Sequence, residues 1–176
     1  MTEADIRLRP VTDADRPFLR EVYASTREAE LELTGWGKEQ RDAFVGMQFE
    51  AQRADYAHRH PGARHDLILV DGEAAGRLYV DRTATSILVI DIALLPAWRR
   101  RGVATALLSS LTAEARAGGR TLQLHVERFN PARALYERLG LRVVEEGPVY
   151  LRMEHGGGCH DPMTPDEERP EPPATT

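Results

Sequence analysis

The chain has little of three features that would each point to a particular class of protein. Its 176 residues include a single cysteine, Cys159, so no disulfide framework can form and a reducing cytoplasm is the natural compartment. No apolar run approaches the roughly 18 residues that a membrane-spanning helix needs. The first ten residues lack the basic and apolar segments of a secretion signal. We therefore expect a soluble, cytoplasmic protein that is not exported and does not enter a membrane.

An excess of positive charge is also missing. The sequence has 28 acidic and 23 basic residues and a formal charge of −5. A protein that mainly neutralises nucleic-acid phosphates carries the opposite balance, so nucleic acid is not an expected partner and any basic patch must be local.

Motifs for nucleotides and metals are missing as well. The sequence contains neither G-x-G-x-x-G nor G-x-x-x-x-G-K-[ST], which disfavours a dinucleotide or nucleoside triphosphate enzyme. Two sets of candidate metal ligands are spaced too loosely, and we expect them to lie in loops or the tail without binding metal. These sets are His58, His60 and His65, and His155, Cys159 and His160.

The composition otherwise suits one globular domain, with 41% hydrophobic and 29% charged residues. Residues 156–176 differ, because they contain glycine, proline, acids and threonine but almost nothing that could enter a core. We predict a domain over residues 1–155 followed by a disordered acidic tail over 156–176.

Periodicity and turn residues predict a mixed α/β fold with helices on both faces of a mixed sheet. Asp71-Gly72 is a hairpin turn between two apolar runs, and 87–95 is nearly all apolar, as expected for a central strand. Helices are predicted from a cap at Asp13 or Asp15 to about 26, and over 38–58, 102–117 and 130–139. Strands are predicted at 6–10, 67–70, 75–80, 87–95, 122–126, 141–144 and 149–153.

Residues 95–104 join the predicted central strand to the start of an amphipathic helix. Helix starts offer free backbone N–H groups and a positive dipole end, and Gly102 lets a ligand approach without a Cβ in the way. Arg99, Arg100 and Arg101 add charge and forked donors. The segment therefore favours a phosphate site, and the alternative is a solvated basic turn.

Two segments resemble the signatures of the GNAT superfamily of N-acetyltransferases. Residues 99–104, RRRGVA, resemble Arg/Gln-x-x-Gly-x-Gly/Ala, and residues 130–140, NPARALYERLG, resemble N-x-x-A-x-x-L-Y-x-x-L-G-F. Ala104 stands where many members have glycine, and Leu141 where phenylalanine is usual.

This resemblance covers roughly residues 5–154, and it implies a sheet of six or seven strands splayed between the fourth and the fifth. It also implies acetyl-CoA as co-substrate, with its pantetheine arm along the fourth strand. The residues it assigns to the cofactor are Ala93, Leu94, Arg99, Arg100, Arg101, Gly102, Val103, Ala104, Asn130, Ala132 and Tyr136.

Acyl transfer to an amine passes through an oxyanion and releases a thiolate. The resemblance implies a backbone N–H near Leu94 as the oxyanion donor and Tyr136 as the acid beside the sulfur. A phenol is a weaker acid than a thiol, so Tyr136 is expected to act mainly as a hydrogen-bond donor. The alternatives are a packing role for Tyr136 and a helix-capping role for Asn130, which is compatible with cofactor binding.

A base is needed because a lysine-like amine is almost entirely protonated at pH 7, and its neutral form costs roughly 4.6 kcal/mol. Asp91, His125 and Glu127 are the candidates, and each could act directly or through water. Asp91 could instead be a buried carboxylate satisfied by the backbone, and the other two could be a solvated strand end.

The acceptor pocket implied by the resemblance lies around residues 24–40. Glu28, with Glu30 and Glu32, could attract a cationic amine that Trp36 covers with its aromatic face. The alternative for the glutamates is a solvated helix face.

The sequence thus predicts transfer of an acetyl group from acetyl-CoA to a primary amine of a small molecule or peptide. The alternatives are a non-catalytic sensor that retains acyl-CoA and a module that grips nucleic-acid phosphate with the arginines. The sequence names no acceptor and leaves a homodimer open.

Overall fold

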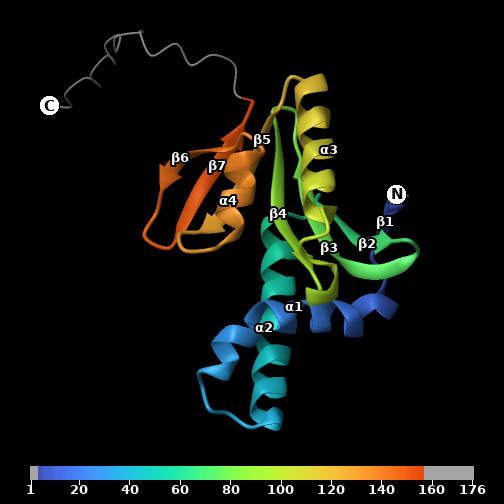
Figure 1. Cartoon of the computed structure of the whole chain (residues 1–176), viewed down its shortest axis with the longest axis vertical. Helices are drawn as coiled ribbons and strands as arrows, with labels where there is room; N and C mark the ends of the chain where they lie inside the picture. The colour runs from blue at the N-terminus through green and yellow to red at the C-terminus, as the bar shows by residue number, and fades with distance from the viewer. Residues whose placement is uncertain (1–3, 157–176) are drawn as a thin grey trace, which may run out of the picture.

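Seven strands form one mixed sheet in the computed structural model, which describes residues 4–156 (Figure 1). Their spatial order is β1-β2-β3-β4-β5-β7-β6. The prediction of a mixed α/β domain with a seven-stranded sheet is confirmed. The tail predicted for 156–176, apart from Gly156, lies outside the described residues, as do Cys159 and His160. The strands are β1 (Ile6–Pro10), β2 (Arg64–Val70), β3 (Glu73–Arg82), β4 (Ser86–Leu94), β5 (Thr121–Glu127), β6 (Arg142–Glu146) and β7 (Tyr150–His155).

Four α-helices accompany the sheet, and their positions follow the predicted ones closely. They are α1 (Arg16–Glu32), α2 (Lys38–Arg59), α3 (Val103–Ala117) and α4 (Ala132–Arg138), and short 3-10 turns cover Asp13–Asp15 and Pro96–Trp98. The first helix runs six residues beyond its predicted end, because Leu31 is buried in the cluster that α1 forms with α2. Among the helices of residues 4–156, none combines the length and apolar character that a bilayer crossing requires.

The sheet buries apolar residues on both faces, as predicted. Alternate residues of β2 enter different clusters: Ile68 and Val70 pack with Leu107, Leu108 and other residues of α3. Leu67 packs instead with α1 and α2 residues such as Leu19 and Phe49. Since side chains alternate across a strand, α3 covers one face, and α1 and α2 cover the other.

Strand β4 is paired along nearly its whole length on one side but only along its first half on the other. Its antiparallel pairing with β3 runs from Ile87 to Leu94, with an irregularity between Val89 and Asp91. Its parallel pairing with β5 covers only Ser86 to Val89, opposite Thr121 to Leu124. Beyond that point β4 and β5 separate. On its other side β5 stays paired with β7, from Leu122 to Glu127. The predicted splay between the fourth and fifth strands is therefore present.

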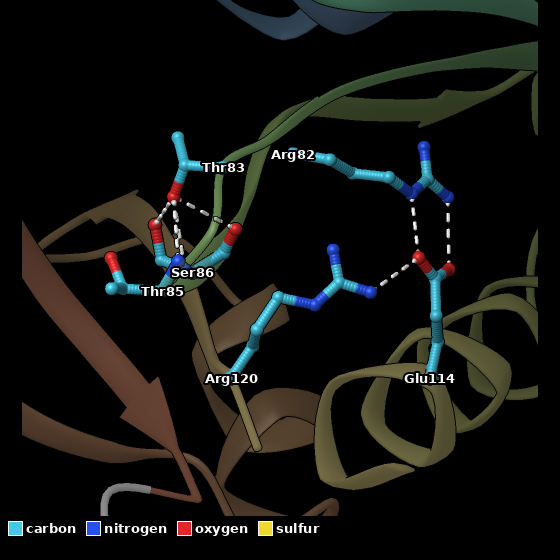
Figure 2. Close-up of polar contacts among 6 residues, drawn as sticks. All are labelled: Arg82, Thr83, Thr85, Ser86, Glu114 and Arg120. Carbon is cyan, nitrogen blue, oxygen red and sulfur yellow. Dashed lines mark hydrogen bonds and ion pairs between the residues drawn. The ribbon is translucent and has the colours of Figure 1, made fainter. Parts of the chain in front are cut away.

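An ion-pair cluster holds the far end of α3 against the β3–β4 hairpin, as Figure 2 shows. Arg82 of β3 donates to both carboxylate oxygens of Glu114, with Nε–Oε1 2.7 Å and Nη2–Oε2 3.0 Å. Arg120, just before β5, also donates to Glu114. The Thr83 hydroxyl accepts the Ser86 N–H and closes the hairpin turn. The contacts to Glu114 anchor the carboxyl end of α3 to the sheet.

Candidate active site

A cleft of about 270 Å³ opens where β4 and β5 separate. It is bordered by β4 and β5, by α1 and α2 on one side, and by α4 and β7 on the other. Sequence-predicted residues that line it are Asp91, Ala93, His125, Glu127, Asn130 and Tyr136. The splay thus brings together residues that lie up to 45 positions apart in the sequence.

The unpaired half of β4 presents backbone groups to this cleft. The N–H of Leu95 donates to the carbonyl of Ala75, the residue before Gly76 in β3, so Leu95 points away from the cleft. Backbone groups alternate in direction along a strand, so the N–H and carbonyl of Leu94 point away from β3, toward the edge of β4 that faces β5. The N–H predicted to meet an oxyanion therefore lies on the correct edge of β4.

The predicted phosphate loop forms a tight turn into α3. Arg100 has φ +60° and Gly102 has φ +80°, both in the left-handed region. A Cβ built on Gly102 would meet nothing within 4 Å, so the glycine is there for its backbone conformation and for open space beside it. Within residues 4–156 no side chain caps α3. The free N–H groups of the first helical turn are thus available to an anion.

The three arginines of this loop have different environments. Arg99 donates from Nε to the Leu94 carbonyl (2.9 Å) and from Nη2 to the Ser25 hydroxyl on α1 (3.2 Å). Arg100 is exposed, and the guanidinium carbon of Arg101 lies 5.1 Å from the centre of the Trp98 ring. Arg99 therefore ties the loop to β4 and α1, while Arg100 and Arg101 supply surface charge next to the helix start.

Val103 and Ala104 follow the loop as the first residues of α3. Val103 is buried, and Ala104 packs against the core cluster. Only their backbone N–H groups can therefore serve a ligand at the helix start.

Tyr136 and Asn130 border the cleft from the α4 side. The Tyr136 side chain packs against the core, and burial, together with the Asp91 carboxylate, raises its pKa to about 12. The phenol therefore stays protonated and can donate a hydrogen bond. The side chain of Asn130 accepts the N–H of Ala132, the first residue of α4, at 2.9 Å, so it supports the helix start while also lining the cleft.

Asp91 is in ion-pair contact with a buried arginine that sequence reasoning did not identify. Oδ2 of Asp91 lies 2.5 Å from Nη2 of Arg77, which also donates to Oε1 of Gln52 (2.8 Å). Arg77 is 4% exposed and lies on the same face of the sheet as Asp91. The half-buried Asp91 carboxylate therefore has a charged partner rather than only backbone donors.

The two residues predicted to bind the acceptor lie elsewhere. Glu28 is on the exposed part of α1, and Trp36 packs edge-on against Phe44, with ring centres 5.3 Å apart. Neither lines the cleft. From the same helix, Arg27 and Glu30 do line it, and their side chains pair with Nη1–Oε1 3.1 Å.

Sequence reasoning also missed other polar cleft residues, among them Tyr23, Gln52, Tyr56, Arg77 and Tyr150. The sequence around Arg77 carried a signal, because this charged residue stands between Gly76 and Leu78 in the buried middle of β3. The others lie on helices or a strand far from both signatures, where nothing in the local sequence marks them.

Metal ligands do not gather around the cleft. Across the described part of the chain, no group of three or more His, Cys, Asp or Glu side chains is arranged to hold a metal ion. His60, from one of the sets considered in the sequence, has its Nδ1 3.2 Å from Oδ2 of Asp81.

Comparison with known proteins agrees with this arrangement. The model of the acetyltransferase (GNAT) family matches residues 19–141. No protein with a curated description matches the chain.

Solved structures show the same fold. The PaiA N-acetyltransferase from Thermoplasma acidophilum, in complex with coenzyme A, is 16% identical with a TM-score of 0.66, covering 87% of this chain and 99% of that one. An acetyltransferase from Thermus thermophilus is 24% identical with a TM-score of 0.61, covering 85% and 96%. The yncA protein of Salmonella typhimurium, solved with its cofactor acetyl-CoA, is 20% identical with a TM-score of 0.54, covering 92% and 98%.

Proposed function

Because the chain belongs to the acetyltransferase (GNAT) family, we propose that it is a cytoplasmic enzyme that transfers an acetyl group from acetyl-CoA to a primary amine. The acceptor would be a small molecule or a peptide. The observation that supports this most is the joint position of the β4–β5 splay and the uncapped start of α3. One offers a strand edge for the pantetheine arm, and the other offers N–H groups for the diphosphate.

The residues present fit acetyl-CoA at this site. Arg100 and Arg101 bring positive charge to the helix start, and Gly102 leaves space beside it. On the cleft side β4 has no strand partner at Ala93 and Leu94, where the Leu94 carbonyl accepts a hydrogen bond from Nε of Arg99. Val103 and Ala104 would contribute backbone N–H groups, and Asn130 would contribute its side-chain NH2 group. The Ala132 N–H is already bonded to Oδ1 of Asn130, so Ala132 would act by supporting Asn130.

In the proposed reaction the amine nitrogen attacks the thioester carbonyl carbon and the carbon–sulfur bond then breaks. The Leu94 N–H donates to the oxygen on which negative charge develops. Tyr136 donates a hydrogen bond to the departing sulfur. With a phenol pKa of about 12 against a thiol near 8.5, complete proton transfer to the thiolate would be uphill by on the order of 5 kcal/mol, so hydrogen bonding is the role that fits.

The attacking amine must lose a proton, and two carboxylates border the cleft to receive it. Asp91 faces the α1–α2 side of the cleft and Glu127 ends β5, where it is exposed. Asp91 lies in the less solvated place, and we assign it as the first acceptor of the proton, with Glu127 as the alternative through water.

Release of free thiol from acetyl-CoA in the presence of an amine panel tests this function. The panel contains alkylamines, polyamines, aminoglycosides, amino acids and short peptides, and the proposal predicts amine-dependent thiol release with at least one class. A sensor that only binds acyl-CoA would bind the cofactor in calorimetry and release no thiol with any of them.

A further inference from the structure

A second cavity of about 340 Å³ lies under α2, next to the cleft. Its walls come from α2, from His65 on β2, from Arg77 and Tyr79 on β3, and from Asp91 on β4. Gln52, Tyr56, Arg77 and Asp91 line both this cavity and the cleft. The cavity and the cleft therefore adjoin each other at Asp91, the proposed base. The volume of the cavity is within the range of small-molecule sites.

Three buried polar atoms without a hydrogen-bond partner belong to residues that line this one cavity. Among the described residues they are Nε2 of His65, Nε of Arg77 and Oδ2 of Asp91, and no other buried side-chain nitrogen or oxygen of residues 4–156 is unpartnered. Oδ2 of Asp91 touches Nη2 of Arg77 as an ion pair, but the contact lacks hydrogen-bond geometry. Buried polar groups are almost always partnered, so three orphans around one space indicate a polar occupant.

The chemistry of these atoms restricts that occupant. A guanidinium Nε can only donate, and an ionised carboxylate oxygen can only accept. The Nε belongs to the same guanidinium whose Nη2 touches Asp91, so a ligand that meets both needs its own acceptor and donor only a few bonds apart. Tyr56 and Tyr79 stack beside this place, with ring centres 5.4 Å apart, and form an apolar wall.

The charges of the lining residues also indicate a ligand that carries both a donor and an acceptor. Arg77 pairs with Asp91, and Arg53, at the edge of the cavity, pairs with Glu50 (Nη1–Oε2 3.2 Å). The lining itself holds two cations and two anions, with Arg16 also paired to Glu50 from outside the lining (Nη2–Oε1 2.6 Å), and this balance favours a ligand without net charge. An amino acid is such a ligand, because its ammonium and carboxylate groups cancel.

We propose that the cavity under α2 receives the acceptor, and that the acceptor is a free amino acid whose amine meets Asp91 and whose carboxylate meets Arg77. This inference rests on the proposed function. When the ammonium group passes a proton to Asp91, that residue becomes neutral and Arg77 loses its counter-ion. The carboxylate of the acceptor then replaces it, so the buried charges stay balanced, whereas a plain alkylamine would leave the Arg77 charge uncompensated.

The test compares L-phenylalanine, L-phenylalaninamide and phenethylamine as acceptors, with thiol release as the readout. These share a side chain and differ in the carboxylate. Arg77→Lys keeps a cation for Asp91 and removes the free Nε–H. For each acceptor, the ratio of kcat/KM between the native protein and this variant cancels the intrinsic basicity of the amine. We expect the loss to be roughly tenfold or more greater for L-phenylalanine than for phenethylamine, as for a lost hydrogen bond to a charged group.

A second set of variants does not depend on Arg77. Ala54→Phe and Ala57→Phe place rings at the α2 wall of the cavity, away from the cleft, whereas Ala51→Phe changes an exposed residue of α2 that lines neither space. The first two should raise KM for L-phenylalanine and leave acetyl-CoA affinity unchanged in calorimetry. Ala51→Phe should leave both unchanged.

Equal losses for all three acceptors in Arg77→Lys, or Ala54→Phe and Ala57→Phe variants with native KM, would overturn the assignment. The assignment would also be overturned if the native protein bound acetyl-CoA but acetylated neither L-phenylalanine nor L-alanine. That result would leave the proposed cofactor site unaffected. Failure of the native protein to bind acetyl-CoA would instead reject the proposed function, and this inference with it.

Discussion

Nε of Arg99 donates to the carbonyl oxygen of Leu94 at 2.9 Å, so the first arginine of the RRRG turn is bonded to the strand that borders the cleft. Its Nη2 reaches Ser25 on α1 as well. All three arginines are exposed, but these bonds separate their roles, because Arg99 holds the turn in place while Arg100 and Arg101 supply charge beside the helix start.

Arg101→Gln should weaken acetyl-CoA binding several-fold at low salt, and much less at high salt, because an exposed charge acts through a screened field. Arg99→Met should weaken binding at both salt concentrations and lower the melting temperature, because it releases the turn from β4 and α1. Calorimetric titrations at two sodium chloride concentrations distinguish the two. A salt dependence that is the same for both variants would contradict the division of roles.

Gly76→Ala should lower stability and weaken cofactor binding by displacing β4 from the β3 side. A Cβ at this position of β3 would lie 2.1 Å from the carbonyl oxygen of Ala93, which is backbone and cannot rotate away. We expect a loss of about 1–3 kcal/mol in the free energy of unfolding, measured with urea, and weaker acetyl-CoA binding because Ala93 and Leu94 must shift. Gly62→Ala, where a Cβ would meet nothing within 4 Å, is the control. Native stability in the Gly76 variant would show that β4 is less constrained than described.

Tyr136→Phe should leave acetyl-CoA affinity near that of the native protein and slow turnover, since only the hydroxyl that faces the sulfur is lost. Because the pKa of Tyr136 is raised to about 12, its ionisation should not appear in the rate profile between pH 7 and 10. Steady-state thiol release across that range measures both points. An unaltered kcat would remove the hydroxyl from the mechanism.

His65 should make the protein less stable in mild acid. Burial, with the nearby Arg77 guanidinium, lowers its pKa to about 4, whereas an unfolded histidine titrates near 6.5. Between these values the unfolded chain binds more protons than the folded one, so stability present above pH 6.5 is lost as the pH falls toward 4. The change in urea midpoint between pH 7 and pH 5 should be smaller in His65→Gln than in the native protein. Equal changes would mean that this histidine is not shielded.

The sequence predicted most of the fold because the informative patterns are local. The Asp71-Gly72 turn, the apolar run of β4 and the stripe of α3 each depend on neighbouring residues, and each appears where expected. The end of α1 was missed because Leu31 is buried by contacts with α2, which lie outside the local pattern.

The site was predictable only where a signature marks it. Asp91, Asn130 and Tyr136 border the cleft, and the two signatures or an acid within an apolar strand identified them. Arg77, Gln52 and Tyr56 reach the same space from β3 and α2, and only three-dimensional packing brings them to Asp91. Glu28 and Trp36 had a plausible composition but lie on surfaces outside the cleft lining, and their proposed role in acceptor binding stays a prediction.

Calorimetric titration of acetyl-CoA into the native protein and into Gly102→Glu and Gly102→Asn tests the central claim most directly. Asparagine tolerates the positive φ of this position, so Gly102→Asn measures the effect of a side chain without added charge. The account predicts saturable binding to the native protein, weaker binding to Gly102→Asn and no measurable binding to Gly102→Glu, with all three folded by circular dichroism. Native affinity in the folded Gly102→Glu variant would place the diphosphate elsewhere and contradict the account.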